Sequence, residues 1–356
     1  MIRRLLDGEY AGICLVHVPM NFSTSLADMG RPRISKILQL LSVIARIFKA
    51  RVVDGGTILY YPPAGPFLVP VLRDLAILGI TRWMFSATIF HFHAGGVSEM
   101  YRRLPRLLKP IFRTAYYHAD VAIRTSASAP EDGLGLRARS EHIIANGIED
   151  ECENWSNDDS RAGDPPVILH VGMLSEPKGI HDLLEACATL HDDGAAFELV
   201  LAGPVESNEY EARLQSLLDH RNLTGIATVM GPVSGEDKWQ LFRRAGIFCY
   251  PSCHPGETFG LAAVEAMCFG IPVVASSWRG LAEVVEDGVT GLLTPPGDPG
   301  ALAEALMRLL GDPVLRVELG EAGRQRYLRS YTVEQHRLGM QAAFDEVISG
   351  LRGQDG

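Results

Sequence analysis

The chain has 356 residues with a formal net charge of −10 at pH 7, and 47% of its residues are hydrophobic. This length suits two domains of ordinary size, and the apolar fraction excludes a largely disordered protein. The acidic balance argues against a general nucleic-acid-binding protein, which needs an excess of lysine and arginine.

The first half of the chain alternates short apolar segments with helical patterns, and the apolar segments predict strands. These strands are expected at residues 13–18, 57–61, 88–93, 121–125 and 142–145. The polar and acidic stretch over residues 149–166 follows them. We predict that this stretch is the hinge between a first domain at 1–150 and a second domain at 151–334.

The second half repeats the same rhythm more regularly. Strands are predicted at residues 167–171, 199–202, 228–230, 247–250, 272–275 and 291–293, with helical patterns such as 180–190 and 238–244 between them. Continuously apolar strands that alternate with helices indicate a parallel sheet covered on both faces, so the predicted fold class is α/β. Ligands of such sheets bind at the carboxyl ends of the strands.

The cysteines and the apolar runs indicate in which cellular compartment the protein is expected. The six cysteines, at positions 14, 152, 187, 249, 253 and 268, include no C-x-x-C pair, which favours a reduced cytoplasmic protein over a disulfide framework or a zinc site. The apolar run over residues 67–80 is interrupted by Arg73 and Asp74, so it is too short to span a bilayer. Asp7 and Glu9 interrupt the basic first residues before any long apolar run, and we expect no secretory signal.

The most informative segment is HPGETFGLAAVEAMCFGIPVVAS, residues 254–276, in which seven residues separate Glu257 from Glu265. Gly256 and Gly260 bracket a turn that lets the backbone approach a ligand, and residues 261–269 predict a short helix after it. The N-terminus of a helix suits an anion such as a diphosphate, and two carboxylates beside it suit a polyhydroxyl group. A nucleotide sugar combines both groups, whereas the alternative is a βαβ crossover with two solvated glutamates.

This segment resembles the E-x7-E motif of retaining glycosyltransferase family 4, a family of the glycosyl transferases group 1. Residues 271–275 and 283–293 are also in the style of that family. The resemblance implies the GT-B architecture: two Rossmann-like domains whose parallel sheets face each other across a cleft, with a last helix at about 335–356 that packs back onto the first domain.

The resemblance also implies an activity. A hexosyltransferase of this kind moves a sugar, with retention and without a metal or other cofactor, from a nucleoside diphosphate sugar to an acceptor hydroxyl. The acceptor would be a glycan or a lipid-linked molecule, as in the synthesis of a bacterial polysaccharide, a glycolipid or a cell-envelope glycan. Glu257 would contact the sugar hydroxyls and Glu265 the ribose. Thr258 lies in the donor-binding turn, and the N–H groups of Phe259, Gly260 and Leu261 would stabilise the departing diphosphate.

Residues 170–179 resemble the family's G-R-L-x-x-x-K-G motif, in which the arginine and the lysine hold the diphosphate. Gly172 and Lys178 match the motif, but Met173 stands where the arginine is expected. This departure removes a bidentate phosphate contact of about 1.5–3 kcal/mol unless another cation replaces it. A surface lysine in a plain βα loop is the alternative for Lys178.

His91 and His93 follow a predicted strand on the same face, because strand side chains repeat every two residues. In the family a histidine here contacts the donor sugar near the reacting carbon. We assign this role to His93, since Gly95 and Gly96 would leave it at the open end of the strand. A satisfied polar group without a catalytic role is the alternative.

Two further loops resemble the cleft loops of the family. One begins at Gly203 after the strand 199–202, and the other contains Val233 after the strand 228–230. The second of these loops lies near the nucleotide base in the family. Plain βα turns are an equally good interpretation for either residue.

Residues 101–113 carry five basic side chains and no acidic one, interleaved with apolar residues. Each basic side chain near an anionic lipid surface contributes about 1 kcal/mol, and family members with lipid-linked acceptors have such patches in the first domain. The alternative is a solvated helix face broken by Pro105 and Pro110. The location is therefore expected to be cytoplasmic, either free or peripheral on the inner face of the membrane.

The N-terminal half resembles the family less closely. Residues 19–25 contain no glycine pair that could approach the donor phosphates, so residues 23–25 or Gly30 and Arg31 would have to serve instead. This departure and Met173 leave two rival functions open. They are a non-catalytic sugar-nucleotide-binding protein and a GT-B-like sugar-nucleotide epimerase.

Overall fold

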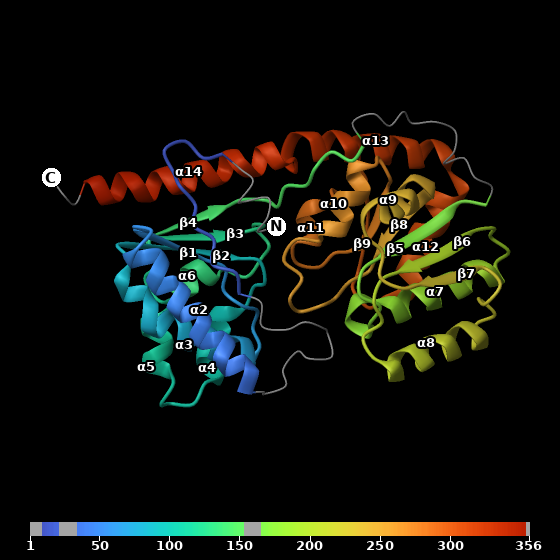
Figure 1. Cartoon of the computed structure of the whole chain (residues 1–356). Coiled ribbons are helices and arrows are strands. Elements are labelled where there is room, and N and C mark those ends of the chain that lie inside the picture. Colours follow the sequence, from blue (N-terminus) through green and yellow to red (C-terminus); the bar gives the residue numbers. More distant parts are fainter. Residues whose placement is uncertain (1–8, 21–33, 153–164, 354–356) are drawn as a thin grey trace. The chain divides into compact units, whose positions relative to one another are not determined.

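The computed structural model describes residues 9–20, 34–152 and 165–353. Internal contacts divide the chain into two units, residues 1–145 with 336–356 and residues 146–335. Each unit contains one parallel sheet flanked by helices (Figure 1). The predicted α/β class is therefore confirmed. Residues 23–25 and 30–31, proposed as substitutes for a glycine loop, lie outside the described residues.

The sheet of the first unit has four parallel strands in the order β1-β2-β3-β4. The strands and the helices among them are β1 (Ile58–Tyr61), β2 (Ala87–Phe92), β3 (Val121–Arg124) and β4 (Ser140–Ile143), with α2 (Ile34–Val52), α3 (Leu68–Thr81), η2 (Arg82–Met84), α4 (Val97–Arg103), α5 (Lys109–Tyr116) and α6 (Asp132–Gly135). The two central strands are buried at every residue, which is why their sequences are continuously apolar. Four of the five strands predicted in this half are confirmed.

The predicted strand at residues 13–18 is wrong, because the described residues 9–20 contain no strand. Ile13 and Leu15 pack against a core cluster, which explains their apolar character. The backbone of Ala11 pairs with the Gln341 side chain of α14 (Val333–Arg352), through an N–H···Oε1 bond of 2.8 Å. Apolar character here reflects packing on a helix, and it does not reflect a place in a sheet.

Helices cover both faces of the first sheet (Figure 1). On one face, Leu78 of α3 and Phe112 of α5 are buried in a cluster with Phe90 and Phe92 of β2. On the other face, α14 places Met340, Ala343, Phe344 and Val347 against Ile89 and its neighbours. The spacing of the α14 residues follows the amphipathic helical pattern, so a single apolar stripe fastens this helix to the sheet.

The sheet of the second unit has six parallel strands in the order β10-β9-β8-β5-β6-β7. Its elements are β5 (Val167–Val171), η4 (Glu176–Lys178), α7 (Ile180–Asp192), β6 (Glu198–Ala202), α8 (Asn208–His220), β7 (Ala227–Met230), α9 (Gly235–Arg244), β8 (Ala245–Tyr250), α10 (Leu261–Cys268), β9 (Val273–Ser276), α11 (Leu281–Val284), β10 (Gly291–Thr294), α12 (Pro299–Gly311) and α13 (Pro313–Ser330). All six strands predicted in this half are confirmed. The strand order reverses between β5 and β8, where sheets of this type bind ligands.

Two layers of side chains hold the second sheet. One face packs on leucines of α7, α8 and α12, including Leu183, Leu214 and Leu302. On the other face, Phe248 of β8 stacks on Phe242 of α9 with ring centroids 5.5 Å apart. All six cysteines lie in described residues and are free thiols, four of them buried, as expected for a chain without a disulfide framework.

The predicted hinge begins inside the second unit. Asp150 accepts hydrogen bonds of 2.7 and 2.6 Å from the two terminal nitrogens of Arg324 on α13. The Ile148 N–H donates to the Tyr331 carbonyl at 2.9 Å. Residues 148–150 are therefore fixed within the second unit, and the division between units falls at residues 145–146 and 335–336. Residues 153–164 of the predicted hinge lie outside the described residues.

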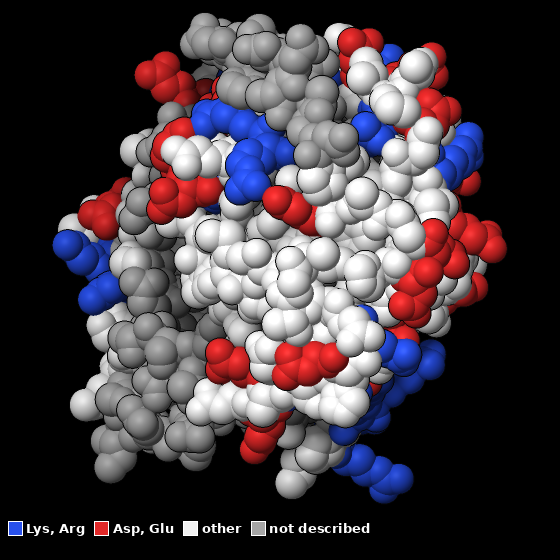
Figure 2. Space-filling view, turned by 90° about the vertical axis from the view of Figure 1, so that its right-hand side faces the viewer, with Lys and Arg blue, Asp and Glu red and all other residues white. Residues whose placement is uncertain are grey.

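The described surface carries charges of both signs. On the face drawn in Figure 2, acidic and basic side chains lie close together around a broad area that has neither. The described side chains on this face thus form no continuous basic surface of the kind that binds a nucleic-acid backbone. Among the helices that the structure describes, none is long and apolar enough to cross a membrane.

One buried carboxylate organises the first unit. Asp74 of α3 is fully buried and accepts hydrogen bonds from the hydroxyls of Tyr61 and Tyr116, at 2.8 and 3.1 Å, and from the Ala64 N–H at 2.7 Å. Arg73 also donates to it at 2.8 Å. Burial raises the pKa of both tyrosine hydroxyls, so they remain donors.

We predict that Asp74→Ala lowers the free energy of unfolding by about 3 kcal/mol, because three buried donors lose their acceptor. Urea denaturation measures this change. Asp345→Ala, which removes an exposed carboxylate on α14, is the matched control and should cost little. Equal effects of the two substitutions would contradict the structural role of Asp74.

Candidate active site

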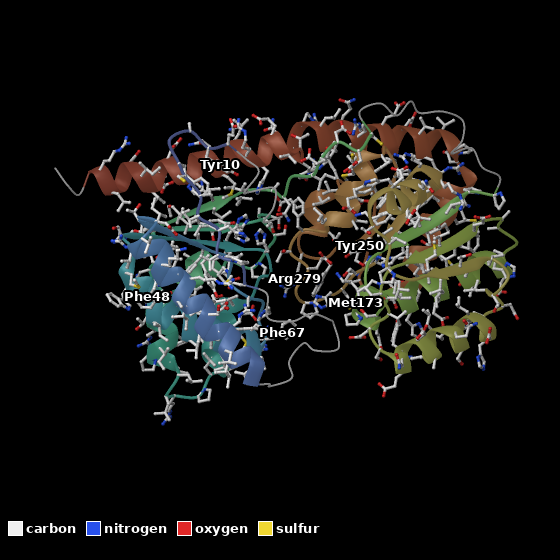
Figure 3. All side chains as sticks on the ribbon, viewed as in Figure 1. Tyr10, Phe48, Phe67, Met173, Tyr250 and Arg279 are labelled. Carbon is white, nitrogen blue, oxygen red and sulfur yellow. The ribbon has the colours of Figure 1, made fainter. Side chains whose placement is uncertain are left out.

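Three neighbouring strands of the second sheet converge on the predicted site. Lys178 follows β5, Glu257 follows β8, and the loop after β9 lies beside them in strand order. β5 and β8 are directly paired and parallel, so their carboxyl ends lie at the same edge. Figure 3 shows Met173 and Tyr250, which mark the ends of β5 and β8. The sheet topology thereby brings together residues that are 79 positions apart in the chain.

Glu257 is the centre of this site. It is 9% exposed, and its Oε2 accepts hydrogen bonds from Lys178 Nζ at 2.7 Å and from the Tyr250 hydroxyl at 3.1 Å. Its Oε1 accepts the Gly260 N–H at 3.0 Å. A cation and several hydrogen-bond donors thus replace the water that this carboxylate loses on burial. The structure therefore places two predicted catalytic residues, Glu257 and Lys178, in direct contact.

The hydrogen bond from Gly260 corrects one expectation. We expected the N–H groups of residues 259–261 to be directed at a diphosphate, but the Gly260 N–H is directed back to Glu257. Gly260 has a φ of +84°, so the chain turns sharply at the start of α10 and the carboxylate three residues earlier caps the turn. Thr258 and Phe259 are buried in this turn, and Leu261 is 38% exposed.

Sequence reasoning missed Tyr250 and His170. The Tyr250 hydroxyl is 3.0 Å from Lys178 Nζ, and its ring lies 5.4 Å from the His170 ring at an interplanar angle of 11°. His170 Nδ1 is 3.0 Å from the Cys249 carbonyl. Burial lowers the pKa of His170 to about 4, so the ring is neutral at pH 7. The signal was a polar residue near the end of each of two apolar strands, at the edge where ligands bind.

Glu265 lies in a separate ion pair. Its Oε1 accepts a 2.7 Å hydrogen bond from Lys238 Nζ, and both side chains are largely buried. The Lys238 ammonium lies 4.4 Å from the centroid of the Trp239 ring, which adds a cation–π contact. The sequence pattern did not single out Lys238, since nothing in its spacing links α9 to Glu265.

Close backbone contacts shape the edge of the sheet. A Cβ on Gly203 would lie 1.7 Å from the Gly172 carbonyl oxygen, and Gly203 has a φ of +150°, so no other residue fits there. Met173 is partly buried beside this contact and brings no charge. Val233 follows β7, which is two strands away from β5. Gly172 and Gly203 thus lie side by side, and Val233 belongs to the outer part of the same edge.

His93 belongs to the first unit and lies one residue beyond β2. As the alternation predicts, it shares a face with His91, with ring centroids 3.9 Å apart. His91 is fully buried and its Nδ1 is 2.7 Å from the Tyr60 hydroxyl. Burial lowers the pKa of His93 to about 4, so both rings are neutral. Among the described residues, no group of three or more His, Cys, Asp or Glu could hold a metal ion.

Comparison with known proteins shows what this chain is similar to. Residues 152–326 match the family described as Glycosyl transferases group 1. The chain is 28% identical over 321 residues to the amylovoran biosynthesis glycosyltransferase AmsK of Erwinia amylovora, which covers 80% of this chain and 75% of AmsK. Other curated relatives are matched over only 39–61% of their own length. The chain thus spans about half the length of most of these relatives.

Two solved structures are similar in fold. One is the sucrose-phosphate synthase of Thermosynechococcus elongatus, with a TM-score of 0.70, 23% identity, and coverage of 90% of this chain and 81% of the other. The other is HepE of Anabaena in complex with UDP-glucose, with a TM-score of 0.68, 21% identity, and coverage of 90% and 84%. At these identities the similarity shows the fold alone, and it confirms the predicted GT-B type.

The family match and the relatives define the class of enzyme. The chain is a glycosyltransferase, and its residues 152–326 match the model of the glycosyl transferases group 1 family. The predicted enzyme class is thereby confirmed, whereas membership of family 4 stays a prediction.

The buried His170 predicts an acid-sensitive second unit. Its pKa is about 4 in the folded protein against an ordinary value of 6.5, so between these pH values the unfolded chain binds more protons. Stability should therefore fall as the pH drops from 6.5 toward 4. We predict that wild type loses about 2 kcal/mol more than His170→Phe between pH 7 and pH 5.

Chemical denaturation at the two pH values measures this difference. The contributions of the other histidines to the pH dependence cancel, because both proteins contain them. His220→Phe, on the exposed side of α8, is the control and should keep the wild-type pH dependence. If His170→Phe keeps it too, His170 is not the acid-sensitive group.

Proposed function

We propose that this glycosyltransferase moves a hexose from a nucleoside diphosphate sugar to an acceptor hydroxyl, with retention and without a metal. The observation that carries the proposal is the Lys178–Glu257 pair at the carboxyl ends of β5 and β8. It presents an ammonium for a phosphate and a fixed carboxylate for sugar hydroxyls at one place. HepE, which has a similar fold, is in complex with UDP-glucose, and this supports a nucleotide sugar as the donor.

The proposed step breaks the bond between the anomeric carbon and the diphosphate oxygen and forms a bond from the same carbon to the acceptor oxygen. The acceptor proton passes to the departing diphosphate, so acceptor and leaving group use the same face of the sugar. Lys178 would stabilise the charge that develops on the diphosphate. Glu257 would orient the sugar through its hydroxyls, Glu265 would bind the ribose, and His93 would contact the sugar near the reacting carbon.

We further propose that the acceptor is a glycan or a lipid-linked molecule in bacterial polysaccharide, glycolipid or cell-envelope glycan synthesis, in the cytoplasm. The name of the relative AmsK, a glycosyltransferase of amylovoran biosynthesis, supports this class of pathway. The rival functions remain distinguishable by assay. A non-catalytic binding protein would release no nucleotide with any acceptor, and an epimerase would interconvert sugars when given the donor alone.

We predict that Glu257→Gln lowers the rate of sugar transfer by about a hundredfold or more, because the sugar hydroxyls and Lys178 lose the charged acceptor that orients them. The measurement is the release of nucleoside diphosphate from a panel of nucleotide hexoses in the presence of glycan and lipid-linked acceptors. Glu304→Gln, on the exposed side of α12, is the matched control. Near-normal turnover of Glu257→Gln, with the fold intact, would refute the role of Glu257.

A peripheral membrane contact is proposed for residues 101–113. Arg102, Arg103 and Arg106 are exposed, and Leu107 and Ile111, which follow them in the chain, expose 87% and 44% of their surface. Exposed apolar side chains flanked by basic ones suit an anionic lipid surface. The remaining two basic side chains are partly engaged, since Lys109 and Arg113 lie 5.1 and 5.2 Å from the Tyr101 ring.

We predict that the protein sediments with liposomes that contain anionic lipid, and that 0.5 M salt or the triple change of Arg102, Arg103 and Arg106 to Ser lowers the bound fraction severalfold. Liposomes of neutral lipid are the control for the lipid charge. A triple change of Arg213, Arg221 and Arg244 to Ser, on or directly after α8 and α9, is the matched control for the protein charge. Equal binding to both kinds of liposome would contradict a charge-driven membrane contact.

A further inference from the structure

Arg279 adopts a backbone conformation that arginine rarely takes. It has a φ of +45°, in the left-handed region that favours glycine, and it lies in the loop after β9. A side chain in this region is strained, because its Cβ approaches the following carbonyl oxygen. Such strain persists where the surroundings fix the loop, and it is frequent at ligand-binding sites.

The surroundings of Arg279 fix the loop against the turn that carries Glu257. A Cβ on the next residue, Gly280, would lie 2.0 Å from the Thr258 carbonyl oxygen, so the two backbones are in close contact. On the other side, the Trp278 indole N–H donates to the His254 carbonyl at 3.1 Å. Arg279 is therefore held between two contacts to residues 254–258.

The guanidinium of Arg279 is only partly satisfied. Its Nη1 is shielded from solvent and has no hydrogen-bond partner among the described residues. Its central carbon lies 5.5 Å from the Trp278 ring, which offers a cation–π contact but no acceptor. A shielded N–H of a charged group without an acceptor is costly, so this side chain is suited to a ligand that supplies one.

The strand order places Arg279 and Lys178 on two sides of Glu257. The order β9-β8-β5 assigns Arg279, Glu257 and Lys178 to three consecutive strands. Two strand spacings amount to about 10 Å, a gap that two long basic side chains can bridge around a diphosphate. Both cations also act on His254, whose pKa is lowered by burial first and then by Lys178 and Arg279. Figure 3 shows Arg279, Tyr250 and Met173, one from each of these strands or the loop after it.

We propose that Arg279 is the cation that replaces the arginine missing at Met173, and that it binds the donor diphosphate together with Lys178. This inference rests on the proposed nucleotide-sugar function. The guanidinium offers a planar pair of donors to phosphate oxygens, which the thioether of Met173 cannot. The phosphate also gives the unpartnered Nη1 an acceptor, so that ligand binding offsets the cost of holding Arg279 in a strained conformation.

The test measures binding of nucleoside diphosphates by calorimetry. Wild type is screened with UDP, GDP, ADP and dTDP and with their nucleotide hexoses, and the tightest nucleoside diphosphate is compared with its monophosphate. We expect Arg279→Met to weaken diphosphate binding by about ten- to a hundredfold and monophosphate binding much less. Arg308→Met, which removes a cation from α12, is the matched control and should bind as wild type does.

Two further variants separate binding from folding. Arg279→Gly removes the cation and relieves the positive φ, so it should raise the melting temperature while it weakens diphosphate binding. Met173→Arg introduced into Arg279→Met should restore most of the lost affinity, because the cation returns to the same site from β5. A merely structural arginine would produce neither result.

The outcomes are distinguishable. If wild type binds a nucleoside diphosphate and Arg279→Met binds it equally well, the role of Arg279 is overturned and the proposed function stands. If wild type binds none of the nucleoside diphosphates or nucleotide hexoses, the proposed function is overturned and the role of Arg279 with it.

Discussion

The burial of one carboxylate constrains the whole candidate site. Glu257 is 9% exposed, so the protein must replace its lost hydration with a cation and with donors held at fixed positions. Lys178, Tyr250 and the Gly260 N–H do so within 2.7–3.1 Å. These three partners come from the loop after β5, from β8 and from the start of α10. The register of the sheet, the turn after β8 and the first turn of the helix are therefore tied to one another.

The residues that donate hydrogen bonds to Glu257 are held in place by their own neighbours. Tyr250 is buried and keeps its proton, since burial raises the pKa of its hydroxyl, and the neutral His170 ring packs flat against it. A charged histidine would place a second cation inside the sheet without a counterion. The contact of Gly203 with the Gly172 carbonyl holds the β5 and β6 loops together, so the segment leading to Lys178 starts from a fixed point. The geometry of the Lys178–Glu257 pair thus depends on residues outside the pair.

The sequence predicted those parts of the molecule in which local pattern decides the structure. Apolar runs identified ten strands. Five of them, β2, β3, β5, β8 and β9, are buried at every residue, and strands buried on both faces need apolar residues throughout. The apolar run at residues 13–18 predicted a strand that does not form, because these residues pack on α14 and pair with no strand. Glu257 and Lys178 were found through local motifs. The contacts of Tyr250 and Lys238 and the proposed role of Arg279 were missed. They depend on which strands and helices become neighbours, and one sequence does not show that.

Under the proposed function, the Lys178–Glu257 pair also determines how a donor would bind. Alone, the two charges neutralise each other, and a diphosphate that drew Lys178 away would leave a buried carboxylate without its cation. A nucleotide sugar avoids this cost, because its hydroxyls can donate to Glu257 while its phosphates accept from Lys178. The sugar and the diphosphate should therefore favour each other's binding, and a free diphosphate lacks half of that compensation. In such a site the same ion pair that stabilises the empty enzyme favours the intact donor over the leaving group that remains after transfer.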